Sequence, residues 1–524
     1  MYTLVGRSLF LIAVLGIQLF SFISCSKNTM DRANPLDKEV LKLNFTEGDV
    51  PSLHPDDLSL IVRGVALSKW IYEGLTRLAP SGEYELAGAE EYTESPCKKI
   101  YTFKLRNNSY SNGEPVTAFD YENFWKASLK PTSRSLKVHL LYCIKNAERA
   151  KKGEVPIDEV GVKALDAQTL VVELEAPTPH LFKLLALPLF VPFKEKNKLA
   201  LSNGPYCVTK WQKNDRLLLE ANPYFWGHAD TRIPKIEIFM IKNASTAFSM
   251  YQNGELDWIG DPFCWLPSEI VLAEIAGHRL KKQEGTIYPF WIHLNTTSFP
   301  LSSPLVRKAL SCVIDREAIT SHVLAADDPL LVPTINCSYS KMAAFDSNIE
   351  LGKRFLDEGM KNLGLTRETF PTLTLSSCDL DNFKKLAAYL QETWQKNLGI
   401  KVELDIKDWN TFFSNIATGN YQMGGYYDSA DYASPLANLE PLAFRTNYPK
   451  WQSEKYKITI EKLKREGDPI IQKKMLQQAS DILKDEMPIL WLTNKGMHHA
   501  YRKDLHGLCF DQRGLPDFRW AYFD

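Results

Sequence analysis

The chain has 524 residues, which is too long for one hydrophobic core and predicts at least two lobes. Its 62 Lys and Arg residues balance its 63 Asp and Glu residues. This balance argues against a nucleic-acid-binding protein, which would carry a basic surface. No apolar run beyond the first 25 residues is long enough to predict a membrane span.

The N-terminus has the form of a secretory signal, because Arg7 precedes an apolar run that ends near Phe22. The run Phe22-Ile23-Ser24-Cys25 resembles a bacterial lipobox, in which the Cys is acylated, although Phe22 replaces the usual Leu. Residues 1–25 are therefore predicted to be a lipoprotein signal peptide, with a lipid such as palmitate on Cys25 and a tether at 26–40. An ordinary signal peptide and an uncleaved single-pass anchor remain open.

The first third of the chain shows several strands and two helices. Alternating apolar and polar residues predict strands at Leu41–Phe45, at Lys99–Leu105 and, as a pair around a turn, within Val160–Pro179. One helix is predicted to end near Gly74. A second helix is predicted within Asn107–Leu129, where Thr117 and Asp120 have the spacing of a capping box.

The clearest unit lies later in the chain. A strand at Pro371–Ser377 is followed by apolar residues at helical spacing, by Gly399 as a helix end, and by a strand at Lys401–Ile406. This βαβ pattern predicts a parallel pair with a right-handed crossover. Helices that begin with Pro are predicted at Pro304–Val323 and Pro469–Lys484. The fold class is therefore α/β.

Two acids follow the strand-like segment Asn420–Gly425, with little basic charge beside them. Asp428 and Asp431 lie three residues apart among tyrosines and small residues. Either they are solvated loop residues, or one of them awaits a cation that is not part of this chain.

The common signatures of enzymes and metal sites are missing. There is no HExxH, GxSxG or P-loop pattern, and the cysteines form no CxxC pair, so no catalytic residue, metal or cofactor is predicted. His498 and His499 would point to opposite faces of a strand, which predicts exposed imidazoles and no shared ion.

Six blocks of the chain form a recognisable series: Pro51–Asp57 with Ile71–Glu85, Tyr101–Leu129, Asn203–Gly227, Tyr251–Ile259, His293–Ile319 and Asn397–Phe413. In this order they resemble the peptide-type (family 5) extracytoplasmic solute-binding proteins of ABC importers. A further block, Gly161–Leu185, is similar to the oligopeptide-binding branch. The resemblance runs from about Leu41 to the C-terminus.

The resemblance implies a two-lobed periplasmic-binding-protein fold of the type II, clamshell kind. The first lobe would comprise 41–69, 185–279 and 498–524, with a subdomain inserted at 70–184. The second lobe would span 280–497. Ligands in such proteins lie in the crevice between the lobes, and hinge closure buries them.

The resemblance also carries a binding role to Asp431, as the carboxylate that receives a peptide's α-ammonium group. A buried ammonium needs a charged acceptor. The alternative is a helix N-cap or turn residue. The main chain of Tyr427, Asp428 and Ser429 would pair with an extended peptide.

The first lobe and one aromatic residue complete the implied site. The segment Leu60–Gly64, with Arg63 as a binding residue, would pair with the peptide from the opposite side. Trp409 matches an aromatic residue of the cleft and could equally belong to the core.

Some positions depart from the family. Asp428 and Ser429 stand where the oligopeptide branch often has Trp and Cys, and Asp428 would either favour a cationic group or a second amine in the ligand or face solvent. Gly425 and Ile416 stand where some relatives have basic residues for the peptide carboxylate. The preferred peptide length therefore stays open.

The predicted function is that of a monomeric, lipid-anchored receptor that delivers short peptides to an ABC permease and its ATPase subunits. It would be neither an enzyme nor a nucleic-acid binder, and it would face the periplasm or the outer surface of a bacterial cell envelope. Alternatives are a receptor for glutathione, murein peptides or a metal chelate, or a non-transport surface protein that keeps the fold.

Overall fold

The computed structural model describes residues 39–524 except 197–198, 284–287, 325–327, 330–331, 334–338, 341–346, 429, 433, 445–446 and 512. Cys25, the signal peptide and nearly all of the tether, and also Ser429, lie outside the described residues. Within the described part, no helix combines the length and hydropathy that a bilayer crossing requires.

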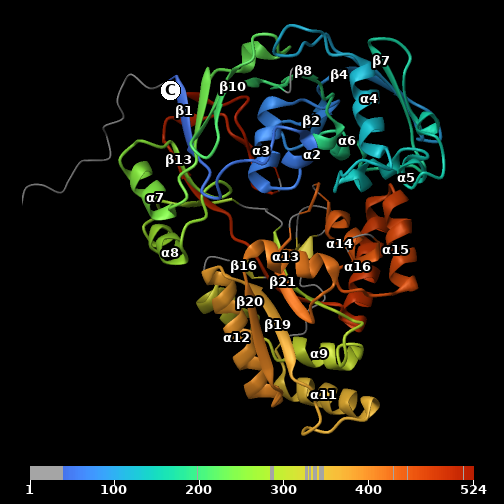
Figure 1. Ribbon diagram of the computed structural model, residues 1–524, viewed down its shortest axis with the longest axis vertical. Helices are drawn as coiled ribbons and strands as arrows, with labels where there is room; N and C mark the ends of the chain where they lie inside the picture. Colours follow the sequence, from blue (N-terminus) through green and yellow to red (C-terminus); the bar gives the residue numbers. More distant parts are fainter. Residues whose placement is uncertain are drawn as a thin grey trace, which may run out of the picture.

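The chain forms two α/β lobes, and Figure 1 shows the first above the second. A four-stranded sheet organises the first lobe, in the order β1 (Val40–Asn44), β12 (Lys235–Phe239), β11 (Arg216–Ala221) and β10 (Tyr206–Gln212). Its helices are α2 (Pro55–Leu58), α3 (Val62–Ile71), α7 (Ala244–Gln252) and α8 (Ser268–Ala276). The C-terminal residues Phe518 and Ala521 share its core with Leu41 and Leu43, which ties both ends of the described chain to this lobe.

A second four-stranded sheet, with its own hydrophobic core, lies beside the first. Its order is β4 (Ala89–Glu94), β5 (Ile100–Leu105), β7 (Thr169–Glu173) and β6 (Val162–Ala164). The helices of this part are α4 (Ala118–Leu129), η1 (Val138–Cys143), α5 (Ala147–Lys151) and α6 (Leu181–Leu184). The predicted capping box of Thr117 and Asp120 is confirmed at the start of α4.

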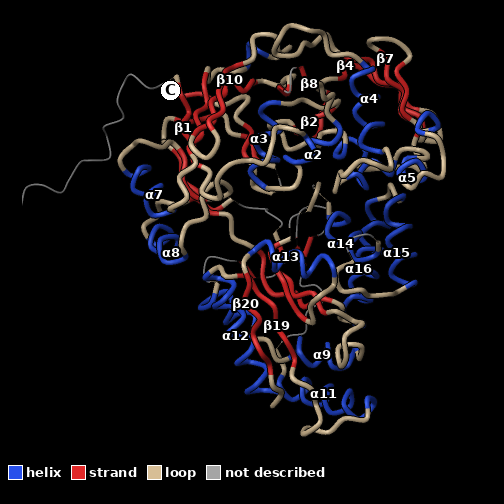
Figure 2. Tube along the Cα trace, viewed as in Figure 1, coloured by secondary structure: helices blue, strands red, loops and turns tan. Residues whose placement is uncertain are grey.

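The second lobe contains a six-stranded sheet flanked by helices (Figure 2). The strand order is β16 (Asp328–Pro329), β22 (Ile489–Asn494), β15 (Pro289–Leu294), β21 (Met423–Tyr427), β19 (Leu373–Cys378) and β20 (Val402–Lys407). The helices are α9 (Pro304–Cys312), α11 (Ile349–Leu363), α12 (Asp381–Leu398), α13 (Trp409–Thr418), α14 (Pro435–Ala443), α15 (Glu454–Arg465) and α16 (Pro469–Glu486). The βαβ prediction is confirmed, because β19 and β20 are parallel and α12 joins them.

Two predictions of local structure are wrong. The helix expected at Pro304–Val323 ends at Cys312, and a new one-turn helix begins after Asp315, whose side chain accepts a hydrogen bond from the N–H of Ala318. The imidazoles of His498 and His499 are buried, not exposed, because their strand is sandwiched between two others. Burial lowers the pKa of His499 to about 4.

The lobes are joined through that three-stranded sheet. The strand β23 (His498–Tyr501) lies between β13 (Trp258–Gly260) and β14 (Lys281–Lys282). The two chain segments that run between the lobes here are joined by main-chain hydrogen bonds. The N–H of Gln283 donates to the carbonyl oxygen of Met497, and the N–H of Lys495 donates to that of Tyr288, each at 2.8 Å. The limits assigned to the lobes and the inserted subdomain from the sequence stay predictions.

Candidate functional site

Three parallel strands of the second lobe end at the same edge of its sheet. The chain leaves β20 into Trp409 at the start of α13, and it leaves β21 into Asp428 and Asp431. From β19, α12 leads outward to β20, and α13 then returns past β19 to β21. Such a reversal opens a crevice at the carboxyl ends of parallel strands, which is where open α/β sheets bind ligands.

The main chain near Asp428 is held by the neighbouring strand β15. Tyr427 pairs with Phe290 of β15, and the N–H of Asp428 donates to the carbonyl oxygen of Pro289 at 2.9 Å. On the other side, the pairing of β21 with β19 ends at Ser376 and Gly424.

Asp431 already has a cation from within the chain. The ammonium of Lys137, in the segment before η1, lies 2.6 Å from Oδ1 of Asp431, and Nε2 of His139 lies 3.5 Å from Oδ2. Burial alone would raise the pKa of Asp431, but Lys137 and His139 hold it well below its usual range. The expectation that this acid awaits a cation from outside the chain is wrong for this structure, because Lys137 in the segment before η1 supplies one. Its assignment to a peptide ammonium stays a prediction.

A further contact from the C-terminal segment fixes the same loop. Nη1 of Arg513 donates to the main-chain oxygen of Asp431 at 3.1 Å. The rest of its guanidinium binds Asp511, which also accepts a hydrogen bond from Lys69 at 2.6 Å. The ring of Tyr432 stacks on His180, with the ring centres 5.0 Å apart and the planes 4° apart. The loop after β21 is thus held by groups from the other side of the lobe junction.

Asp428 has a different environment. It is half-buried, so part of the residue remains accessible to solvent. Burial raises the pKa of its carboxyl to about 7, with Asp431 adding to the rise and Lys137 opposing it. Its neighbour Tyr427 stacks on Tyr288 with ring centres 5.9 Å apart. In an aromatic, partly desolvated environment of this kind, the ionised form of a carboxylate is stabilised by a nearby cation.

Trp409 is neither core nor free of contacts. Its side chain is 43% exposed, and its ring lies 5.9 Å from Phe413 and 6.1 Å from Tyr426, measured between centres. The exposed part of this ring lies at the same sheet edge as the acids, which keeps the predicted ligand contact as a prediction.

The structure gives Arg63 a different role. Its guanidinium pairs with Glu47 and donates to the main-chain oxygens of Gly48 and Asp49. The segment Leu60–Gly64 comprises the turn between α2 and α3 and the first residues of α3. Ile61 itself has an extended backbone, and the predicted pairing of this segment with a peptide stays a prediction.

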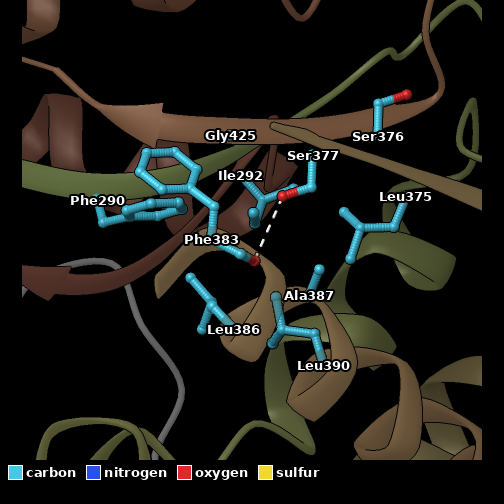
Figure 3. A pocket seen from close by; sticks show the side chains of 10 residues that line it. All are labelled: Phe290, Ile292, Leu375, Ser376, Ser377, Phe383, Leu386, Ala387, Leu390 and Gly425. Atoms are coloured by element: carbon cyan, nitrogen blue, oxygen red, sulfur yellow. Dashed lines mark hydrogen bonds between the residues drawn. The ribbon is translucent and has the colours of Figure 1, made fainter. Parts of the chain in front are cut away.

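The absence of basic residues at two family positions has a steric cause. A Cβ atom on Gly425 would lie 2.0 Å from the carbonyl oxygen of Trp291, and Ile416 is fully buried in the core. The small cavity beneath Gly425, of about 10 Å³, is too small for a ligand (Figure 3). It is lined by Phe290, Ile292, Leu375, Ser376, Ser377, Phe383, Leu386, Ala387, Leu390 and Gly425.

The contacts of Lys137, His139 and Arg513 with Asp431 were not predicted from the sequence. The chain distance between Lys137 and Asp431 is 294 residues, and no local pattern joins them. Only the spatial arrangement of the two lobes brings these groups together. Over the ranges that the structure describes, no cluster of three or more His, Cys, Asp or Glu residues is arranged to hold a metal ion.

The fold is the two-lobed fold of solved solute-binding proteins. Peptide-bound OppA of Listeria monocytogenes aligns over 93% of this chain and 99% of its own, with a TM-score of 0.78 and 22% identity. An oligopeptide-binding protein of Borrelia burgdorferi (OppAIV) aligns over 93% and 100%, with a TM-score of 0.79 and 25% identity.

Sequence comparison gives the family. The model for bacterial extracellular solute-binding proteins, family 5, matches residues 83–450. The oligopeptide-binding protein OppA of Bacillus subtilis is 31% identical over 98% of each chain, and the murein peptide-binding protein MppA of Escherichia coli is 27% identical over 80% of this chain and 82% of its own. The chain belongs to family 5 of the bacterial extracellular solute-binding proteins, and the relatives named here are binding proteins, not enzymes.

Proposed function

We propose that this protein captures short peptides between its lobes and delivers them to an ABC permease, while a lipid on Cys25 holds it at the cell envelope. One observation carries the proposal. The acids Asp428 and Asp431 stand at the carboxyl edge of the second-lobe sheet, opposite Lys137 and Arg513 from the rest of the molecule. The likeness to the Bacillus subtilis oligopeptide-binding protein over nearly the whole chain supports it.

The edge of β21 suggests how a peptide would be held. Its pairing with β19 is described as far as Gly424, and an extended peptide would add main-chain hydrogen bonds beyond that point, while the pockets for its side chains would tolerate many sequences. The acids would receive the amino end, and Trp409 would cover part of the ligand.

Thermal unfolding and tryptophan fluorescence with a peptide panel test the proposal. A ligand that binds only the folded protein stabilises it by about 2.7 kcal/mol at a concentration of 100 times Kd. Peptides with a free amino end should raise the melting temperature, and their N-acetylated forms should do so less. A broad panel that produces no shift at millimolar concentration contradicts the proposal.

A murein peptide is the second candidate ligand, supported by the similarity to MppA of Escherichia coli. A murein tripeptide belongs in the same panel, where stabilisation exceeding that by ordinary tripeptides would favour it.

The anchor has a separate test: labelled palmitate should be incorporated into the wild-type protein in cells and not into Cys25→Ser.

A further inference from the structure

The connection between the two lobes contains a buried ion pair. The chain enters the second lobe from β14 to β15 and returns from β22 to β23. Asp261 follows β13 of the first lobe, and Lys495 follows β22 of the second. The ammonium of Lys495 lies 3.0 Å from Oδ1 of Asp261, and the two side chains are 14% and 8% exposed. The pair therefore joins one lobe to the other beside the segments that connect them.

Asp261 is fixed to the first lobe. Its N–H donates to the carbonyl oxygen of His498 at 2.8 Å, and its Oδ2 accepts a hydrogen bond from the N–H of His498 at 3.0 Å. The preceding glycine permits this close approach, because a Cβ on Gly260 would lie 2.3 Å from the same carbonyl oxygen. Trp258, at the start of β13, is part of the first-lobe core. The carboxylate of Asp261 therefore moves with the first lobe.

Lys495 begins in the second lobe and reaches the first. Its N–H donates to the carbonyl oxygen of Tyr288, the residue before β15, at 2.8 Å. Its ammonium lies beside Asp261 and 4.8 Å from the ring centre of Trp265, both in the first lobe. The ring centre of Tyr427, at the end of β21, lies 6.0 Å from the same ammonium. Since aromatic rings attract an ammonium at these distances, Lys495 is bound by groups from both lobes.

The lobes also meet outside this connection. The ammonium of Lys385, near the start of α12, lies 3.0 Å from Oε1 of Glu269, in the first turn of α8. The pair of Asp261 and Lys495 is therefore formed in an arrangement in which the lobes are in contact. A rotation that separates the lobes would carry Asp261 with the first and the main chain of Lys495 with the second. Because an unpaired buried charge is costly, the pair favours the arrangement in which the lobes meet.

We propose that Asp261 and Lys495 are positioning residues, which hold the lobes in the closed arrangement and so set the affinity for the ligand without contacting it. This inference rests on the proposed peptide-binding function, in which closure of the lobes buries the ligand. A ligand that binds the closed form has an apparent dissociation constant that grows as the closed fraction falls. Removal of the pair should therefore weaken binding although the residues that contact the ligand are unchanged.

Substitutions can change the pair in graded ways. Asp261→Asn removes the negative charge and keeps an oxygen for the N–H of His498. Lys495→Met removes the cation and keeps the length of the side chain, and Lys495→Arg keeps the cation. The double variant Asp261→Asn with Lys495→Met leaves neither charge unpaired, so it replaces Lys495→Met if that variant does not fold. The matched control is Lys308→Met, because Lys308 is 16% exposed and pairs with Asp485 inside the second lobe.

Two measurements report the effect. Small-angle X-ray scattering of the ligand-free protein measures the separation of the lobes as a radius of gyration, and calorimetry with the tripeptide Ala-Ala-Ala measures affinity. Asp261→Asn and the double variant should have a larger radius of gyration than the wild type. Their dissociation constants should be roughly 10-fold higher, which is within the usual range of coupling between separate sites. Lys495→Arg should keep both values near those of the wild type, and Lys308→Met should leave them unchanged.

The inference and the proposed function can fail separately. If the wild type binds the peptide and the variants keep its affinity and its radius of gyration, the pair only supports the fold, and this inference alone falls. Weaker binding with an unchanged radius of gyration would place Lys495 in contact with the ligand, which also overturns the positioning role. If the wild type binds no peptide of the panel, the proposed function falls, and the role assigned to Asp261 and Lys495 in setting affinity falls with it.

Discussion

Two acids near the lobe junction, Asp511 and Asp428, have opposite electrostatic environments. Asp511 accepts hydrogen bonds from Lys69 at 2.6 Å and from Arg513 at 3.0 Å, and these cations hold its pKa well below the usual range despite burial. Asp428 has no such partner among the described residues, and burial raises its pKa to about 7. The same side chain is thus a structural anion in one place and an open acceptor in the other.

The difference shows what distinguishes a structural acid from a binding one. In the first lobe the chain supplies its own cations: both oxygens of Glu73 lie 2.9 Å from Arg519, and its side chain is completely buried. At the end of β21 the chain leaves one carboxylate without a partner, at a cost in stability that a ligand can offset. Stability and binding should therefore respond in opposite ways to removal of the two kinds of acid.

The largest effect on stability is expected at the buried acid Glu73, which pairs with Arg519. Glu73→Gln leaves the buried guanidinium of Arg519 without its main partner and should destabilise the protein by about 3–5 kcal/mol. Urea unfolding followed by far-ultraviolet circular dichroism measures the loss. Lys384→Ala, which breaks an exposed pair, is the control and should cost at most about 1 kcal/mol. An equal effect of both variants would erase the distinction between buried and exposed pairs.

The backbone of β21 just before Asp428 should not tolerate a larger side chain at Gly425. In Gly425→Ala the new methyl group would meet the carbonyl oxygen of Trp291 at 2.0 Å, so we expect a loss of about 1–3 kcal/mol in the same assay. Gly467→Ala is the matched control, since a Cβ there meets nothing within 4 Å. It should be neutral or stabilising by up to about 1 kcal/mol. A neutral Gly425→Ala would mean that β15 and β21 are less tightly paired than described.

Features set by neighbouring residues could be predicted from the sequence. The apolar spacing of Phe383, Leu386 and Leu390 predicted α12, and Gly399, with φ of 66°, ends it as expected. The capping box at Thr117 was equally local. The α/β class and the parallel pair follow from such signals, while the two-lobed architecture came from the family resemblance.

Features that depend on distant residues could not be predicted in this way. The pairing of Asp431 with Lys137 depends on how the lobes meet, and the commitment of Arg63 to Glu47 depends on a turn fifteen or more residues away. The burial of His498 depends on two strands that flank it from other parts of the chain. In each case the charge or the polarity was visible in the sequence, but its partner was not.

Asp428 should make the ligand-free protein less stable as pH rises. Because the pKa of Asp428 is raised in the folded state, the unfolded chain loses its proton first, near pH 4, and stability falls as pH increases toward 7. Asp428→Asn should remove this fall and stabilise the protein by about 1–2 kcal/mol at pH 8, with little effect at pH 4. Melting temperatures across this range check the sign. A destabilising effect at pH 8 would show that the carboxylate has a partner in the folded protein.

The smallest effect on stability is expected at Trp409, whose ring is 43% exposed. Trp409→Phe should change the free energy of unfolding by no more than about 1 kcal/mol, because the new ring keeps aromatic contacts with Phe413 and Tyr426 and the indole is already partly exposed. It should nevertheless remove much of the fluorescence change on peptide binding, since this indole stands at the edge of the sheet beside the acids. Trp394→Phe is the contrasting variant: its fully buried indole donates to the carbonyl oxygen of Leu310, inside the second-lobe core. This variant should lose stability and keep the ligand-dependent signal. If the signal is instead lost with Trp394 and kept with Trp409, the ligand acts on the core of the lobe, and the carboxyl edge of the sheet is not where it binds.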